Sequence, residues 1–224
     1  NGAGKTTVID AITGLVPASG SVNKSGVELL GKKVHQIARR GIGRTFQTAS
    51  VFEELTVLQN LDIAAGAGRS VWTMLRRRHG VLPAIEQALH TIGLTELADK
   101  PAGILAHGQK QWLEIGMLLV QNADVLLLDE PVAGMSHEER EETGNLLRRI
   151  GAERTVVVVE HDMDFMREFA TSVTVLARGQ VIAEGSVAEV QANPRVQEVY
   201  LGTAAVGSAE SEETGAAELI EEKS

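Results

Sequence analysis

The first seven residues, Asn1-Gly2-Ala3-Gly4-Lys5-Thr6-Thr7, form a glycine-rich stretch that runs directly into a helical pattern. A loop that cradles phosphate groups has the form G-x-x-x-x-G-K-[ST], and Gly4, Lys5 and Thr6 supply its last three positions. Small residues let backbone N–H groups turn inward around phosphate oxygens, and the following helix points its positive end at the same anion. Lys5 would then reach the β- and γ-phosphates, and the Thr6 hydroxyl would hold Mg²⁺. The alternative is a glycine turn followed by a chance Lys-Thr pair.

The start of the sequence falls inside this loop. The first glycine of the pattern would lie two residues before Asn1, and the chain does not begin with Met. We therefore expect a fragment that is truncated at its N-terminus and lacks the strand before the loop. For the same reason, the absence of a visible signal peptide carries little weight.

Composition narrows the class of protein. The chain has 224 residues, of which 43% are hydrophobic, so it can bury a sizeable core. It contains no cysteine, which suits a reducing compartment. The net charge is -9, of which -5 belongs to residues 203–224, and this mild acidity argues against a nucleic-acid surface. The longest apolar runs are strand-sized and far shorter than the roughly 18 residues that span a bilayer.

Short apolar runs alternate with helical patterns, which predicts an α/β fold with a mostly parallel sheet and helices on both faces. Buried strands are expected at Val125–Leu128 and Thr155–Val159, and a shorter strand at Ile42–Phe46. Small antiparallel hairpins are expected within 20–30 and between 173–177 and 181–183. Capping boxes predict helices that begin after Thr56, Ser136 and Ser186. Further helices are expected at Lys5–Leu15, Val34–Arg40, Val71–Arg78, Pro83–Ile92, Gly108–Val120, Met163–Ala170 and Pro194–Leu201.

The pattern of the chain changes between Gly66 and Gly103, where helical patterns dominate. We interpret residues from about 56 to 122 as a helical subdomain inserted into an α/β body. The basic cluster at 76–79 is most simply a solvated helix face, and a contact with lipid headgroups is the alternative. Residues 203–224 are rich in Ala, Gly, Ser and Glu and are expected to be a disordered acidic tail.

Polar side chains follow the predicted strands at the edge where α/β proteins bind ligands. Asp129 and Glu130 come directly after Val125–Leu128. Asp129 would bind Mg²⁺, directly or through water, and Glu130 would polarise an attacking water as general base. His161 ends the next strand and could orient that water, and Gln47 follows a strand where its amide could ligate Mg²⁺. Solvated acids that open a turn, and a histidine that simply caps a strand, are the alternatives.

A second turn of small residues precedes a helix at Leu105-Ala106-His107-Gly108-Gln109. The N-terminus of a helix attracts anions, so this turn predicts a second phosphate-type site. An ordinary loop-to-helix junction is the alternative. A dimer that binds nucleotide between unlike sites would explain two such sites in one chain.

These features occur in one order: phosphate loop, glutamine, glycine turn, Leu-Leu-Leu-Asp-Glu-Pro and Val-Glu-His-Asp. Together they resemble the ATP-binding subunits of ABC transporters, a family of P-loop NTPases, over residues 1 to about 202. The resemblance implies that Val125–Asp129 is the Walker B strand, Leu105–Gln109 the signature motif and Gln47 the Q-loop. It implies ATP contacts from Asn1, Gly2, Ala3, Gly4, Lys5, Thr6, Thr7, Gln47, Ala106, His107, Gly108, Gln109 and Asp129, Mg²⁺ ligands from Thr6, Gln47 and Asp129, and catalytic roles for Glu130, His161 and Lys5.

Family members work as head-to-tail dimers, so the resemblance implies a second ATPase subunit, identical or different. It also implies membrane permease subunits, an indirect solute-binding protein and a peripheral position on the cytoplasmic face of the membrane. A narrower likeness points to importers of branched-chain amino acids, urea and short amides, carried by Gly43–Gln47, Leu105–Gln109, Pro131–Met135 and Val199–Gly202. Residues 106–117 look most like the urea importers. The sequence therefore predicts urea or short amides as the cargo, with branched-chain amino acids as the alternative.

The signature departs from the usual Leu-Ser-Gly-Gly-Gln, because Ala106 replaces the serine and His107 a glycine. Ala106 removes a hydroxyl that would bond the γ-phosphate, and His107 is a conceivable substitute for it. Ser136 stands where the family has an aspartate, and it is expected to cap a helix instead. Phe52 and Leu55 are apolar residues in a polar loop and are expected to dock a permease helix, or else to tuck into the core. A soluble ABC-type ATPase acting on ribosomes or DNA, and a damaged binding module, remain the alternative functions.

Overall fold

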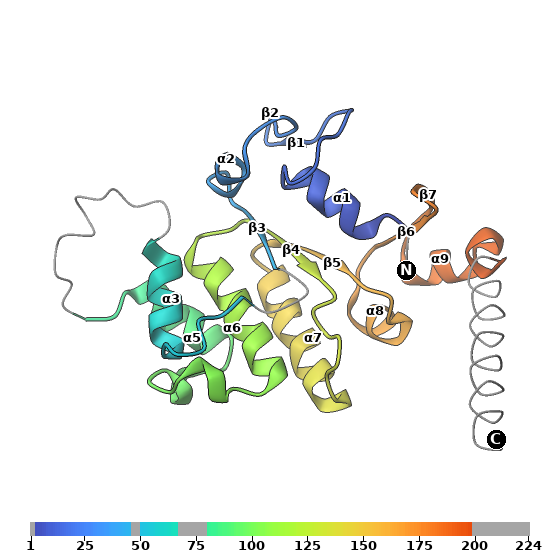
Figure 1. The fold of residues 1–224 in the computed structure, drawn as a ribbon. Coiled ribbons are helices and arrows are strands. Elements are labelled where there is room, and N and C mark those ends of the chain that lie inside the picture. The colour runs from blue at the N-terminus through green and yellow to red at the C-terminus, as the bar shows by residue number, and fades with distance from the viewer. Residues whose placement is uncertain (1–2, 46–49, 67–79, 199–224) are drawn as a thin grey trace, which may run out of the picture. The chain divides into compact units, whose positions relative to one another are not determined.

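The computed structural model describes residues 3–45, 50–66 and 80–198 of the chain (Figure 1). They form two compact units, one of Thr6–Phe165 and one of Asn1–Lys5 with Met166–Ser224. Gln47, the helix predicted at Val71–Arg78 with its basic cluster, and the tail 203–224 lie outside the described residues. No helix within the described residues is both long and apolar enough to cross a membrane.

A three-stranded parallel sheet organises the larger unit, as predicted. β4 (Val125–Asp129) lies between β3 (Ile42–Arg44) and β5 (Thr155–Val159). Leu127 of β4 is in register with Arg44 on one side and with Val157 on the other. Because the strands are parallel, their carboxyl ends meet at one edge, where Asp129 ends the central strand.

The prediction that Thr155–Val159 is a buried strand was wrong for one of its faces. Thr155 and Val157 are exposed, and 42% of Val157 is accessible to solvent. Among the described residues β5 pairs only with β4, so it is an edge strand. Every position from 156 to 159 is valine, and this uniform run hides the two-residue alternation that would have revealed an open face.

The N-terminal part of this unit packs on the sheet through a small apolar cluster. α1 (Lys5–Ile12) is followed by a hairpin of β1 (Asn23–Lys24) and β2 (Val27–Glu28), and then by α2 (Val34–Ala38). The two short strands are antiparallel, which confirms the predicted hairpin. The cluster that joins these elements to β3 and β4 contains Ile9, Leu29, Ile37, Ile42 and Leu127.

The segment predicted as a helical subdomain contains α3 (Val57–Gly66), α5 (Pro83–Thr91) and α6 (His107–Val120) among its described residues. Two single turns of 3-10 helix, Thr95–Leu97 and Ala102–Ile104, lie between α5 and α6. α6 comes close to its neighbours at Gly116, where a Cβ atom would lie 2.7 Å from Ile92 and 3.2 Å from Leu61. A larger residue at this position would therefore push the helices apart.

The predicted capping boxes are present. The Thr56 backbone donates to Gln59 Oε1 and the Thr56 hydroxyl accepts from the Gln59 backbone, so α3 begins there. Ser136 and Glu139 make the same reciprocal pair of bonds at the start of α7 (His137–Gly151). These bonds satisfy N–H groups that a helix otherwise leaves unpaired in its first turn.

The smaller unit is an antiparallel hairpin covered by short helices. β6 (Val173–Ala177) pairs with β7 (Gln180–Gly185), and Ser186 caps α9 (Val187–Ala192). A further helix occupies 194–198, the described part of the helix predicted at Pro194–Leu201. Its core is formed by Val173, Val190 and Val196. α8 (Met163–Phe169) runs across the boundary between the units.

Candidate active site

The described part of the phosphate loop has the backbone that its glycine requires. Gly4 has a φ of 91°, a conformation that residues with a side chain rarely adopt, and the helix begins at the next residue, Lys5. Thr6 and Thr7 then lie in the first turn of α1. These residues are the part of the phosphate loop that leads into the helix, where backbone N–H groups can point at an anion. Asn1 and Gly2 lie outside the described residues.

Asp129 is the buried carboxylate of the site. Only 1% of its side chain is exposed, and neither carboxylate oxygen has a hydrogen-bond partner within the described residues. A cation lies close to it, since Arg44 Nη2 is 3.8 Å from Asp129 Oδ2. A buried carboxylate without hydrogen bonds is costly unless something binds its oxygens. Asp129 therefore fits the predicted role of a Mg²⁺ or metal-water ligand.

Arg44 is a residue that the sequence analysis did not single out. Its side chain is 9% exposed and pairs with Asp10 of α1, and its Nη1 lies 3.4 Å from the Thr13 hydroxyl. Arg44 thus ties the helix after the phosphate loop to the carboxylate at the end of β4. The signal was weak because residues 10, 44 and 129 are far apart in the sequence. Only the presence of a charged residue within the strand predicted at Ile42–Phe46 could have suggested it.

Glu130 has an unusual backbone. Its φ is 50°, in the left-handed region, and its N–H donates to the carbonyl of Val159 at 2.8 Å. A residue with a side chain costs roughly 1–3 kcal/mol in this region, and such strain gathers at functional sites. The turn redirects the chain directly after β4, so that Glu130 and Asp129 do not follow the alternation of a continuing strand.

The structure brings Glu130 and His161 together, as their places at neighbouring strand ends predict. Nδ1 of His161 lies 3.4 Å from Oε1 of Glu130, and 65% of the His161 side chain is exposed. An exposed imidazole beside a half-buried carboxylate leaves its second nitrogen available to a ligand. Among the described residues, no hydrogen bond joins this pair to Thr6.

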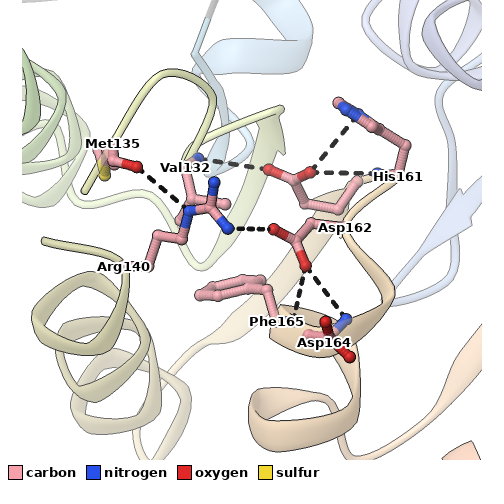
Figure 2. A network of polar contacts seen from close by, with 8 residues as sticks. Val132, Met135, Arg140, His161, Asp162, Asp164 and Phe165 are labelled. Carbon is pink, nitrogen blue, oxygen red and sulfur yellow. Dashed lines mark hydrogen bonds and ion pairs between the residues drawn. The ribbon is translucent and has the colours of Figure 1, made fainter. Parts of the chain in front are cut away.

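Glu160 is a second residue that the sequence analysis passed over. Only 1% of its side chain is exposed, and Oε1 accepts the N–H of Val132 at 3.3 Å (Figure 2). Its other oxygen accepts the N–H of His161 at 3.1 Å and lies 3.8 Å from the His161 ring. Glu160 therefore holds the histidine segment against the loop after Glu130. Glu160 could have been found from the sequence because it is a charged residue beside a candidate catalytic histidine.

The predicted signature turn forms the N-terminus of α6. The backbone N–H of Ala106 donates to Gln109 Oε1 at 3.1 Å, so the glutamine closes the turn that Ala106 cannot cap. Nε2 of His107 lies 3.1 Å from the carbonyl of Ala133. The ring of His107 therefore contacts a loop of its own chain.

Glu139 lies against the same turn. A Cβ atom on Gly108 would come within 2.9 Å of Glu139 Oε1, so glycine permits this approach. Hydrogen bonds from the Ser136 backbone and hydroxyl, and from the Gly108 backbone, lower the pKa of Glu139, and His107 adds a smaller electrostatic contribution. Glu139 therefore accepts the N–H of Gly108, which lies in the turn that the sequence assigned to phosphate.

The candidate docking loop lies next to α3. Phe52 is 51% exposed and Leu55 is half-buried, so Phe52 is the more accessible of the two apolar residues. The neighbouring turn of 3-10 helix bonds to this loop through Gly103 and exposes 68% of Ile104. The two exposed apolar side chains belong to adjoining segments of one surface.

The chain is similar in sequence to known proteins. The sequence profile of the family "ABC transporter" matches residues 1–133, and that of "Branched-chain amino acid ATP-binding cassette transporter" matches residues 180–206. The chain is 36% identical to the high-affinity branched-chain amino acid transport ATP-binding protein BraF of Pseudomonas aeruginosa, over 91% of the chain and 85% of that protein. It is 35% identical to the probable branched-chain amino acid transport ATP-binding protein LivG of Archaeoglobus fulgidus, over 90% of the chain and 82% of that protein.

A solved structure agrees with these relatives. The crystal structure of the ADP conformation of an ATP-binding cassette from an ABC transporter superimposes with a TM-score of 0.75 at 31% identity. It covers 90% of this chain and 85% of that one. The predicted fold, a P-loop ABC ATPase with a parallel sheet and small antiparallel hairpins, is confirmed. The chain therefore belongs to the ABC transporter family, as an ATP-hydrolysing, ATP-binding subunit related to those of branched-chain amino acid transporters.

Proposed function

We propose that Glu130 and His161 are the hydrolytic centre of this ATPase. The observation that carries the proposal is the 3.4 Å approach of His161 Nδ1 to Glu130 Oε1 at the strand edge where Asp129 lies buried. Glu130 accepts a proton from the attacking water, and His161 orients the water and the γ-phosphate. The left-handed backbone of Glu130 fixes the carboxylate on the ligand side of the sheet.

The phosphates and the metal fall to the remaining predicted residues. Residues 1–7 would cradle the phosphates through backbone N–H groups, with Lys5 as the cation at the β- and γ-phosphates. Thr6, Gln47 and Asp129 would hold Mg²⁺, which when bound offsets the negative charge of the phosphates. The buried Asp129 oxygens, which have no hydrogen-bond partner in the part of the chain that the structure describes, support this part of the proposal.

We infer that the cargo of the transporter is a branched-chain amino acid. Residues 106–117 favoured urea or short amides, but the relatives with high coverage carry branched-chain amino acid transport names, and so does the profile that matches residues 180–206. None of these findings supports the urea prediction. The alternative cargo stated from the sequence is therefore the better supported one.

The proposed assembly is a head-to-tail dimer on the cytoplasmic face of the membrane, bound to permease subunits. The second subunit is needed because the turn Ala106–Gln109 would contact the nucleotide held by the phosphate loop of its partner. Phe52 and Ile104 offer an exposed apolar surface of the kind that receives a partner helix. A solute-binding protein would deliver the cargo to the permeases, and no nucleic acid takes part.

One assay tests both the activity and the cargo. The chain is reconstituted with its permease subunits in vesicles, and ATP hydrolysis is measured with binding protein loaded with leucine, isoleucine or valine, and with urea or acetamide. We expect hydrolysis to rise with the branched-chain amino acids only. Stimulation by urea alone would restore the original cargo prediction, and the absence of hydrolysis under every condition would contradict the proposed activity.

A further inference from the structure

Arg140 of α7 joins two segments that carry the candidate hydrolytic residues. Its Nη1 pairs with Oδ2 of Asp162 at 2.7 Å, and its Nε donates to the carbonyl of Met135 at 3.3 Å (Figure 2). Asp162 directly follows His161, and Met135 closes the loop that begins after Glu130. One guanidinium therefore bridges the loop 131–135 and the histidine segment.

The two oxygens of Asp162 have separate tasks. Oδ1 accepts the N–H groups of Asp164 at 3.1 Å and Phe165 at 2.9 Å, which caps α8. Oδ2 is left for Arg140. Since asparagine keeps a carbonyl oxygen for the cap but carries no charge, the two tasks can be separated by one substitution.

A second carboxylate makes a parallel connection on the other side of His161. Glu160 accepts the N–H of Val132, at the opposite end of the same loop from Met135. Glu160 reaches the loop directly and Asp162 reaches it through Arg140, while the His161 ring lies beside the Glu130 carboxylate.

We propose that Arg140 is a positioning residue that makes the loop 131–135 and the segment 160–162 move together. The side chains of Glu130 and His161 then keep their positions relative to each other during hydrolysis. The planar guanidinium meets a carboxylate and a carbonyl at once, which a single ammonium group does with poorer geometry. The catalytic consequence rests on the hydrolytic role proposed above, whereas the mechanical connection does not.

The ion pair of Arg140 and Asp162 is expected to contribute little to the stability of the fold. The Arg140 side chain is 41% exposed and that of Asp162 21%, and ion pairs this open to water add little to the free energy of folding. Removing the pair is therefore expected to leave the protein folded while it releases the two segments from each other. This makes the inference testable with intact protein.

Hydrogen–deuterium exchange of the full chain measures the connection itself. We expect Arg140→Met and Asp162→Asn each to raise exchange in both the loop 131–135 and the segment 160–165. Arg148→Met is the matched control, since Arg148 is exposed on the same helix and bonds to Asn145 instead. Exchange in Arg140→Met equal to that in Arg148→Met would overturn the proposal.

Steady-state hydrolysis measures the consequence. Arg140→Met is expected to lower kcat by roughly 10- to 100-fold with little change in KM, as for small displacements of reacting groups, and Arg140→Lys to recover part of it. The double variant with Asp162→Asn should lose no more than one single variant. Fully additive losses, or a loss confined to KM, would contradict the positioning role. If exchange responds as expected but the unaltered protein hydrolyses no ATP, the connection stands and the proposed function fails.

Discussion

The amide of Asn60, completely buried in α3, bonds both backbone groups of Phe52. The N–H of Phe52 donates to Asn60 Oδ1 at 2.8 Å, and Asn60 Nδ2 donates to the Phe52 carbonyl at 3.0 Å. The same Nδ2 also reaches the carbonyl of Thr56 at 2.9 Å. The backbone of the loop is thus fixed from inside while 51% of the Phe52 residue remains exposed. An apolar ring held rigidly in solvent is a preorganised contact for a partner.

Phe52→Ala is expected to separate coupling from chemistry. The basal ATPase of the isolated subunit should stay near normal, because the ring contributes little to the core, while stimulation by loaded binding protein in the assembled transporter should be lost. Paired ATPase assays with and without the permeases check this. If both activities fall together, the ring belongs to the fold and the docking surface lies elsewhere.

Asn60→Ala should behave differently from Phe52→Ala. It leaves buried backbone groups of the loop without partners, at about 1–3 kcal/mol each, so the free energy of unfolding should drop measurably. Urea denaturation of the two variants beside the unaltered protein checks the contrast. Equal stability of all three proteins would show that Asn60 does not fix the loop.

Arg44→Met should be strongly destabilising. It leaves the carboxylates of Asp10 and Asp129 without their cation, and breaking a buried pair in this way costs about 3–5 kcal/mol. Because Asp129→Asn removes one of those carboxylates, the double variant should lose less than the two single variants together. Denaturation midpoints of the four proteins test this, and strict additivity would refute the pairing.

Glu28, in the hairpin of β1 and β2, is expected to make the stability of the protein depend on pH. The Ser21 hydroxyl, followed by the backbone N–H groups of Val22 and Leu30, lowers the pKa of Glu28 to about 2. A carboxyl whose pKa is lowered by folding stabilises the folded state above its unfolded pKa, and this contribution is lost as pH falls from about 4.5 to about 2. Glu28→Gln should flatten the dependence of the unfolding free energy on pH in that window. An unchanged slope would show that the hydrogen bonds do not favour the ionised form.

Much of the secondary structure could be predicted from local sequence patterns. The residue spacing at Thr56, Ser136 and Ser186 predicted three capping boxes that the structure contains, because each depends only on residues three apart. Apolar runs predicted the parallel pairing of β4 and β5. The ends of helices were less certain, and α1 stops at Ile12 instead of Leu15.

Contacts between distant segments were beyond the reach of these signals. Arg44 meets Asp10 and Asp129 across 34 and 85 residues of sequence, and the buried Glu160 accepts the N–H of Val132 across 28 residues. The His107 ring likewise meets the carbonyl of Ala133, 26 residues further along the chain. Hydrophobic periodicity places residues on faces of elements, but the partner across each face is decided by tertiary packing.

The central claim is that Glu130 is the general base of an ATPase, and one substitution tests it most directly. Glu130→Gln keeps the size of the side chain and removes its basicity. We expect the variant to bind ATP and accumulate as a dimer while hydrolysis falls by roughly 10²–10⁴-fold, the range for loss of acid–base catalysis. ATP turnover and sedimentation in the presence of ATP measure both effects. Near-normal turnover would contradict the assignment of Glu130 and with it the proposed hydrolytic centre.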